Sequence, residues 1–387
     1  MEKIYEKINY IILIILILTL MIFILYTYSE NRLIYKEFIK KCKSDKLIIQ
    51  DKPENIFVSI CLPALNMEKY IKQALLSLIY QSFQNFEIII VNDNSNDKTQ
   101  DIIQKFQDKD KRIKLINHSK NLGVYASRAN AILNALGKYV LLMDPDDMLL
   151  NQNLFQHLYY YSNYNLDIME FLVYHKNEDQ KNIIIPEKPW LSHFHNFNKD
   201  IIYQPELSDI LFYVPNSKNY SQIICRTIWN KLIRKEIIKK SINYLNNDYF
   251  RNQFLIAADD TPINILVFQF AKNYSNIKVP GYLYLLRDGG MSNDNKGNIK
   301  HDIILSYNFL LYFQFFYKYI KVFKKDINFF FYDFKPFSVY LKILKEFNAT
   351  KYIPKAIRFL KIIKENNDNI SLAFKSHLDN LTMYFLK

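Results

Sequence analysis

Three aspartates stand within four residues in the segment Asp144-Pro145-Asp146-Asp147, directly after the apolar run 139–143. Carboxylates this close repel one another, and a shared divalent cation relieves that repulsion. Hard oxygen ligands with open positions suit Mg²⁺ or Mn²⁺ that also contacts the phosphates of a substrate. A surface turn is the alternative interpretation of the segment, because Asp and Pro are common turn residues.

The elements that must hold these carboxylates alternate between short apolar runs, which predict strands, and amphipathic stretches, which predict helices. This alternation is typical of a doubly wound, mainly parallel α/β sheet, in which ligands bind beyond the carboxyl ends of the strands. That edge is expected to carry Asn66, residues 92–94 and residues 144–147. The predicted strands cover 57–62, 86–91, 113–117 and 139–143, and the predicted helices cover 68–80, 97–106 and 125–136.

Composition narrows the class of protein. The chain of 387 residues is 50% hydrophobic and 23% charged, which is neither a disordered nor a multi-span membrane composition. With six glycines and no G-x-G-x-x-G motif, it does not resemble a dinucleotide dehydrogenase. The pair Gly137-Lys138 is followed by Tyr139, so there is no phosphate-binding P-loop. The net charge of +13 has the right sign for nucleic acid, but no recognition motif accompanies it.

An uncharged apolar run covers residues 8–29. About 20 apolar residues cross a bilayer as a helix, so this run predicts a single-pass membrane anchor. Basic residues after the run place the body in the cytoplasm by the positive-inside rule, whereas N-x-S/T sequons favour an ER or Golgi lumen. The predicted order is a short tail (1–7), the transmembrane helix (8–29), a stem (30–54), an α/β domain (55–300) and a basic, aromatic-rich helical region (301–387).

Six blocks, in order, resemble the family 2 glycosyltransferases. The resemblance implies a GT-A fold, a Rossmann-like and mainly parallel sheet, for the domain at 55–300. The blocks are V-S-I-C-L-P-A-L-N (58–66), V-N-D-N-S-N-D-K-T (91–99), N-L-G-V-Y-A-S-R-A-N with G-K-Y-V-L-L-M-D-P-D-D (121–130 and 137–147), W-N-K-L-I-R-K-E (229–236), A-D-D-T-P (258–262) and Y-L-L-R-D-G-G-M-S (284–292).

The resemblance implies a donor site for a nucleotide-activated sugar. Asp93 would accept the N–H of a uracil-like base, and Asp144 would bind the ribose. Asp146, with Asp147 close behind, would hold Mn²⁺ or Mg²⁺ on the diphosphate. The residues implied in donor-nucleotide binding are Pro63, Asn66, Asp93, Arg128, Asp144 and Arg287.

The resemblance also implies an acceptor side. One carboxylate of the pair Asp259-Asp260, at the start of a helix, would act as general base toward an acceptor hydroxyl. Trp229, next to Asn230 and Lys231, is a candidate for stacking on an acceptor sugar, and core packing is the alternative. One base without a covalent nucleophile implies a single displacement with inversion.

The sequence therefore predicts a membrane-anchored, metal-dependent, inverting glycosyltransferase of the hexosyl or N-acetylhexosaminyl type, with a UDP-linked donor and a glycan, lipid or protein acceptor. A sugar-phosphate nucleotidyltransferase is a rival, but its glycine-rich basic loop is missing after the first strand. The rival outside enzymes is a catalytically silent GT-A-like domain that binds carbohydrate or serves as a scaffold. Nucleic acid is not an expected partner.

Overall fold

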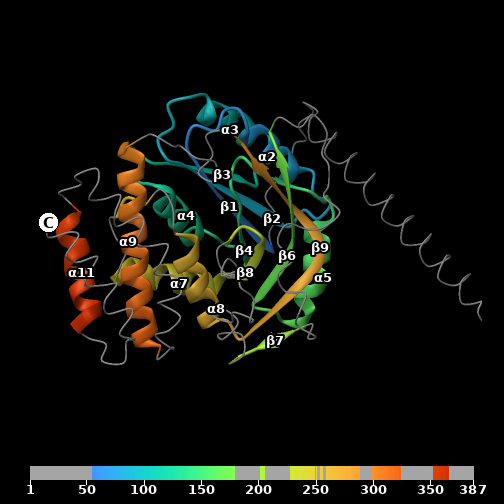
Figure 1. The fold of residues 1–387 in the computed structure, drawn as a ribbon. Helices are drawn as coiled ribbons and strands as arrows, with labels where there is room; N and C mark the ends of the chain where they lie inside the picture. The colour runs from blue at the N-terminus through green and yellow to red at the C-terminus, as the bar shows by residue number, and fades with distance from the viewer. Residues whose placement is uncertain are drawn as a thin grey trace, which may run out of the picture.

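One mixed sheet of nine strands runs through the described part of the chain, with helices on both faces (Figure 1). The computed structural model describes residues 55–178, 201–204, 227–248, 250, 253–255, 259–287, 299–323 and 352–365. The strand order is β3-β2-β1-β4-β8-β6-β9-β5, and β7 pairs with β9. The strands are β1 (Val58–Ala64), β2 (Phe86–Asn92), β3 (Ile113–Asn117), β4 (Tyr139–Leu142), β5 (Met148–Leu149), β6 (Ile168–Asn177), β7 (Ile202–Tyr203), β8 (Lys231–Arg234) and β9 (Asn273–Leu286).

The first half of the sheet confirms the predicted parallel α/β arrangement. Strand β1 is parallel to both β2 and β4, and β2 is parallel to β3. The second half differs, because β8 is antiparallel to both β4 and β6. The helices are α2 (Ile71–Ile79), α3 (Thr99–Gln107), α4 (Val124–Leu133), α5 (Leu154–Tyr161), α7 (Lys235–Asp248), α8 (Asp260–Phe270), α9 (Ile299–Val322) and α11 (Ile353–Glu365), with the 3-10 helix η1 (Ser162–Tyr164) after α5.

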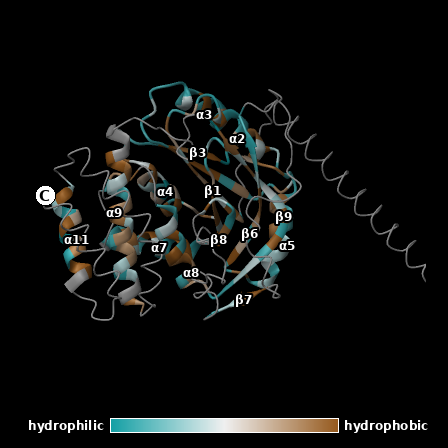
Figure 2. Ribbon diagram, in the orientation of Figure 1, coloured by the Kyte–Doolittle hydropathy of each residue, from teal (hydrophilic) through white to brown (hydrophobic). Residues whose placement is uncertain are grey.

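Alternate residues of the central strands feed two hydrophobic cores, one on each face of the sheet. Along β2, Phe86, Ile88 and Ile90 pack with α2, α3 and α5 on one face. Ile89 and Val91 pack on the other face with α4, α7, α8, α9 and α11. Figure 2 shows hydrophobic residues running through the central strands between these helices. Because both faces are covered, the central strands are mainly apolar.

The described part of the C-terminal region is helical, as predicted. Helix α11 lies outside α9, which in turn lies beside α7 and α8 (Figure 1). The rings of Tyr307 and Tyr352 stack with centroids 4.3 Å apart, and Lys355 donates to the Tyr307 hydroxyl.

The predicted membrane anchor at 8–29 lies outside the described residues, as do the tail 1–7 and the stem 30–54. Within the described ranges, none of the helices combines the length and the apolarity that crossing a bilayer requires.

A buried polar network ties the start of β1 and β2 to the turn before β4. Glu87 and Ser59 are partners in the register of the two strands, and the Ser59 hydroxyl donates to Glu87 Oε1 at 2.7 Å. The Leu136 N–H donates to the same oxygen, and the Gly137 N–H donates to Ser59 Oγ. A side chain at Gly137 would place its Cβ 2.7 Å from the Ser59 nitrogen, so the close approach of the turn to β1 also requires a glycine.

Replacing the acceptor of this network should destabilise the fold. We expect Glu87→Leu to lower the free energy of unfolding by about 2–3 kcal/mol, because the buried Ser59 hydroxyl and the part-buried Leu136 N–H lose their acceptor. Glu87→Gln keeps a carbonyl oxygen and should cost about 1 kcal/mol. Urea denaturation of the two variants and the wild type measures both values. Equal destabilisation by Leu and Gln would contradict this account of the network.

Candidate active site

The side chain of Arg128 joins three carboxylates from distant parts of the chain. Arg128 lies on α4, Asp144 follows β4, and Asp259 and Asp260 stand where α8 begins. Arg128 Nη1 donates to Asp259 Oδ1 and Oδ2 at 2.9 and 2.8 Å, and it also donates to Asp260 Oδ1. Arg128 Nη2 donates to Asp144 Oδ1 at 2.7 Å. The two predicted sides of the site, donor and acceptor, thus meet at one guanidinium.

This cluster extends from the core to the surface. The side chains of Arg128 and Asp259 are 5% and 3% exposed, whereas those of Asp144 and Asp260 are 24% and 21% exposed. Burial opposes the charged guanidinium, but the charges of Asp259, Asp260 and Asp144 outweigh it and raise the pKa of Arg128. A permanently charged Arg128 therefore holds two carboxylates that a substrate can reach.

Asp260 titrates close to neutral pH. Burial raises the pKa of Asp260 to about 7, and the negative charges of Asp259 and Asp144 also raise it. The positive charges of Arg128 and Lys231 act in the opposite direction. A general base works best when its pKa lies near the operating pH, so Asp260 has the properties of a proton acceptor.

Asp147 is buried and both of its carboxylate oxygens are engaged. The Tyr282 hydroxyl donates to Asp147 Oδ2 at 2.7 Å, and the Leu285 N–H donates to Oδ1 at 2.8 Å. Burial raises the pKa of Asp147 well above its usual value, and the charges of Asp146 and Asp144 add to that shift. The Tyr282 oxygen also accepts the Asp144 N–H, so β9 holds the whole acidic turn in place.

Asp146 faces Arg287 at the end of β9. Arg287 Nε donates to Asp146 Oδ2 at 2.5 Å, and both side chains are partly exposed. Burial and the nearby charge of Asp144 raise the pKa of Asp146, and Arg287 offsets part of this. The Arg287 guanidinium also lies over the ring of Tyr70, 5.0 Å from its centroid. Arg287 therefore neutralises part of the charge of Asp146.

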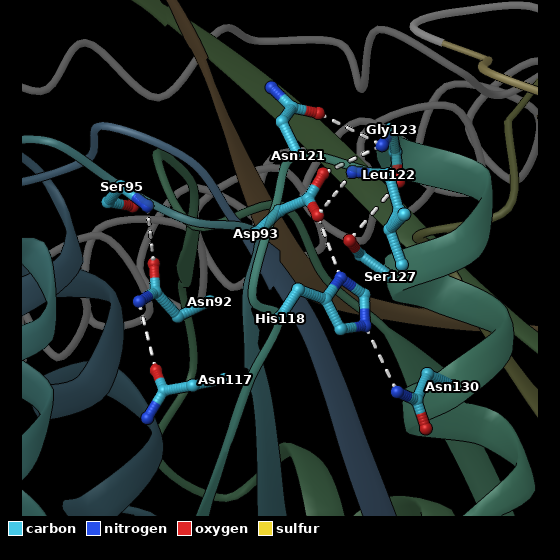
Figure 3. Close-up of polar contacts among 10 residues, drawn as sticks. All are labelled: Asn92, Asp93, Ser95, Asn117, His118, Asn121, Leu122, Gly123, Ser127 and Asn130. Carbon is cyan, nitrogen blue, oxygen red and sulfur yellow. Dashed lines mark hydrogen bonds and ion pairs between the residues drawn. The ribbon is translucent and has the colours of Figure 1, made fainter.

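Asp93, at the end of β2, is held by the loop that leads into α4 (Figure 3). The N–H groups of Leu122 and Gly123 donate to Oδ1 and Oδ2, each at 2.8 Å. His118 Nδ1 lies 2.7 Å from Oδ1, and His118 Nε2 lies 3.0 Å from Asn130 Nδ2. The carboxylate is thus fixed in orientation by groups from the segment between β3 and α4.

Gly123 occupies a position that excludes a side chain. Its φ is +91°, in a region that L side chains rarely adopt. A Cβ would lie 2.4 Å from the backbone oxygen of Leu255, with which Gly123 forms a β-bridge. This close approach lets the Gly123 N–H reach Asp93 and brings the chain before α8 against the start of α4.

The loops after β1 and β2 are fastened together by reciprocal hydrogen bonds. Asn66, at φ +54°, accepts the Asn96 N–H at its Oδ1, and the Asn66 N–H donates to Ser95 Oγ. The Glu68 N–H donates to Asp97 Oδ2 in the same way. Pro63 is buried within β1, beneath these loops.

The three candidate acceptor residues lie in the interior. Trp229 is 5% exposed and stacks on Tyr282, with ring centroids 4.7 Å apart. Asn230 and Lys231 are fully buried. Asn230 Nδ2 donates to Glu170 Oε1 at 2.7 Å, and Lys231 Nζ donates to Asn230 Oδ1 at 2.8 Å. Trp229 therefore packs in the core, which is the alternative that the sequence left open for it.

The sequence of this chain is similar to those of known glycosyltransferases. The family model for glycosyl transferase family 2 matches residues 59–242. This range includes Arg128 and Asp144. An uncharacterized glycosyltransferase of Methanocaldococcus jannaschii is 34% identical over 203 residues, covering 51% of this chain and 67% of that protein. The chain belongs to glycosyl transferase family 2.

Other proteins are also similar to this family 2 chain. The uncharacterized glycosyltransferase EpsJ of Bacillus subtilis is 27% identical over 228 residues, which are 59% of this chain and 60% of that protein. Among solved structures, residues 1–349 of S. aureus TarS in complex with UDP-GlcNAc have a TM-score of 0.46 and 20% identity, covering 76% of this chain and 80% of that one.

Two residues that contact the predicted site residues did not stand out in the sequence. His118 contacts Asp93, and Tyr282 contacts the acidic turn. His118 directly follows the predicted strand 113–117, so its strand-end position was the signal that could have found it. Tyr282 lies inside a long strand among other tyrosines, and no sequence signal distinguishes it.

Substituting Gly123 tests the close approach at the start of α4. We expect Gly123→Ala to lower the free energy of unfolding by about 2–4 kcal/mol, from backbone strain and the clash with Leu255. Ala126→Gly, one turn along the helix at a half-buried position, serves as control and should cost about 1 kcal/mol or less. Chemical denaturation provides both numbers. A Gly123→Ala variant no less stable than the control would refute the argument.

Proposed function

We propose that this family 2 chain is an inverting glycosyltransferase that moves a sugar from a nucleotide-linked donor, such as a UDP-sugar, to an acceptor hydroxyl. The observation that carries the proposal is the Arg128 cluster. It places a carboxylate with a pKa near neutrality, Asp260, beside the strand-end carboxylate Asp144. A transferase needs a base for the acceptor next to a site for the leaving nucleotide.

On the donor side, Asp93 and Asp144 would bind the nucleoside. Asp93 is held rigidly at the end of β2 and would accept an N–H of the base. Asp144 is partly exposed and would accept a ribose hydroxyl. Arg128 would act near the nucleotide through Asp144, since both of its terminal nitrogens are engaged by carboxylates. Asn66 and Pro63 shape the loop and strand that border this side.

We propose that a divalent cation binds at the acidic turn. Among the described residues, no group of three or more His, Cys, Asp and Glu side chains is arranged to hold a metal. Mg²⁺ bound to phosphates needs only one or two carboxylates, however. Asp146 is partly exposed, and the charge of Asp144 raises its pKa, so a cation here would relieve repulsion. Asp146 would hold Mn²⁺ or Mg²⁺, which supplies charge stabilisation to the departing diphosphate.

On the acceptor side, Asp260 would take the proton of the attacking hydroxyl. Its side chain is open to solvent on one side, and Arg128 holds it in place. Asp259, bound through both oxygens to Arg128, would position the guanidinium. A single base and no covalent nucleophile give one displacement with inversion at the anomeric carbon.

The remaining residues of the site would support it. Asp147, engaged by Tyr282 and Leu285, would position Asp146 without binding the cation itself. Arg287 would leave Asp146 for the diphosphate when donor binds. Trp229, Asn230 and Lys231 would support the sheet beneath the site, in accordance with their burial.

Anchoring to a membrane through residues 8–29 is also part of the proposal, and the uncharged apolar run supports it.

Nucleotide release by the full chain, in detergent with Mn²⁺ and a panel of nucleotide sugars, tests the function. We expect slow hydrolysis of one donor. Asp260→Asn should slow the reaction by about 10²–10⁴-fold, because an amide cannot take the proton. Asp146→Asn should abolish the Mn²⁺ dependence of donor hydrolysis. Asp101→Asn, on the exposed start of α3, is the matched control and should react as the wild type does.

Different outcomes test the roles of Asp260 and Asp146 and the transferase function itself. Equal rates for Asp260→Asn, Asp146→Asn and the control would refute the assigned roles. Failure of the wild type to bind any nucleotide, measured by calorimetry, would refute the transferase and favour a silent carbohydrate-binding or scaffold domain.

A further inference from the structure

His118 has no part in the function proposed above, yet it makes a close contact with the carboxylate that would read the base. It is the first residue after β3, and its side chain is 7% exposed. Its Nδ1 lies 2.7 Å from Asp93 Oδ1, and its Nε2 faces Asn130 on α4 (Figure 3). The imidazole therefore links the end of the donor strand to a helix of the site.

A chain of hydrogen bonds determines which imidazole nitrogen carries the proton. Lys114 Nζ, which can only donate, lies 3.1 Å from Asn134 Oδ1. Asn134 Nδ2 must then donate, and it lies 3.0 Å from Asn130 Oδ1. Asn130 Nδ2 in turn donates to His118 Nε2. With Nε2 as acceptor, Nδ1 carries the hydrogen and donates it to Asp93.

The hydrogen bonds to Asp93 are distributed unequally over its two oxygens. Oδ1 accepts from both His118 Nδ1 and the Leu122 N–H, which uses its two lone pairs. Among the described residues, Oδ2 accepts only from the Gly123 N–H, which it shares with Asn121 Oδ1. One acceptor position is thus left on Asp93, and it belongs to Oδ2.

One acceptor position matches some bases and not others. Uracil and thymine offer a single imide N–H between two carbonyl groups. Guanine offers a ring N–H beside an amino group, and this pair of donors requires two adjacent acceptors. A donor left without a partner in a buried site costs binding free energy. The saturation of Oδ1 therefore matters for the choice of base.

We infer that His118 is a positioning residue that saturates one oxygen of Asp93 and so selects a donor nucleotide with a uracil- or thymine-type base over guanine. The inference rests on the proposed function, in which Asp93 accepts an N–H of the base. Asn130 contributes by holding the imidazole in the donating tautomer.

Calorimetric titration of the full chain with UDP, dTDP and GDP in Mn²⁺ tests the inference. The wild type should bind UDP or dTDP at least about tenfold more tightly than GDP, the worth of roughly one hydrogen bond. His118→Leu should lower this preference by about tenfold, because one acceptor position on Oδ1 becomes free beside the one on Oδ2, while the Leu122 N–H still donates to Oδ1. His118→Asn places an amide N–H near the position of Nδ1 and should keep the preference within about threefold of the wild type.

A second measurement distinguishes positioning from damage to the fold. Thermal unfolding confirms that both variants are folded. An unchanged base preference in His118→Leu, or a wild type that prefers GDP, would overturn the inference alone. A wild type that binds none of the three nucleotides would overturn the proposed function, and this inference with it.

Discussion

The site depends on one buried cation. Arg128 is removed from water, and a buried guanidinium is stable only when carboxylates and hydrogen bonds compensate for its lost hydration. Asp144, Asp259 and Asp260 provide that compensation, and they come from the end of β4 and the start of α8. Loss of any one of these contacts would leave buried charge without compensation. The contacts therefore hold α4, the end of β4 and the start of α8 together. The proposed donor and acceptor carboxylates thus share a single electrostatic constraint.

The same edge is reinforced by backbone groups. Asp93 binds the N–H groups at the start of α4, which requires the positive φ and the absent Cβ of Gly123. Asp147 binds the Leu285 N–H and the Tyr282 hydroxyl and so fixes the turn that presents Asp146. Asp93 and Asp147 thus use their carboxylates for hydrogen bonds within the protein, and these bonds hold the neighbouring loops at the site. This division of roles explains why acidic residues with unlike environments stand so close together.

Much of the fold was predictable from the sequence, because the strands of 58–142 are mainly apolar runs and each helix has an apolar face. The antiparallel insertion of β8 was not, since a short apolar segment does not reveal the direction of its partner. The strand-end rule located Asp93 and the turn 144–147. It could not show that Arg128 contacts Asp259, 131 positions away. Nor could it separate Asp146 from Asp147, because their difference arises from Tyr282 on β9. The burial of Trp229, Asn230 and Lys231 depends likewise on distant residues.

The central claim is that Arg128 holds Asp260 as an ionisable base beside the donor site. The pH dependence of donor turnover in the wild type and Arg128→Lys tests it most directly. Wild-type turnover should fall as the pH drops through about 7, because Asp260 takes up a proton there. A lysine contacts fewer carboxylates than arginine does, so it should stabilise the ionised form less and move this midpoint to higher pH. A wild-type rate that does not change across that range, or an identical midpoint in both proteins, would contradict the account.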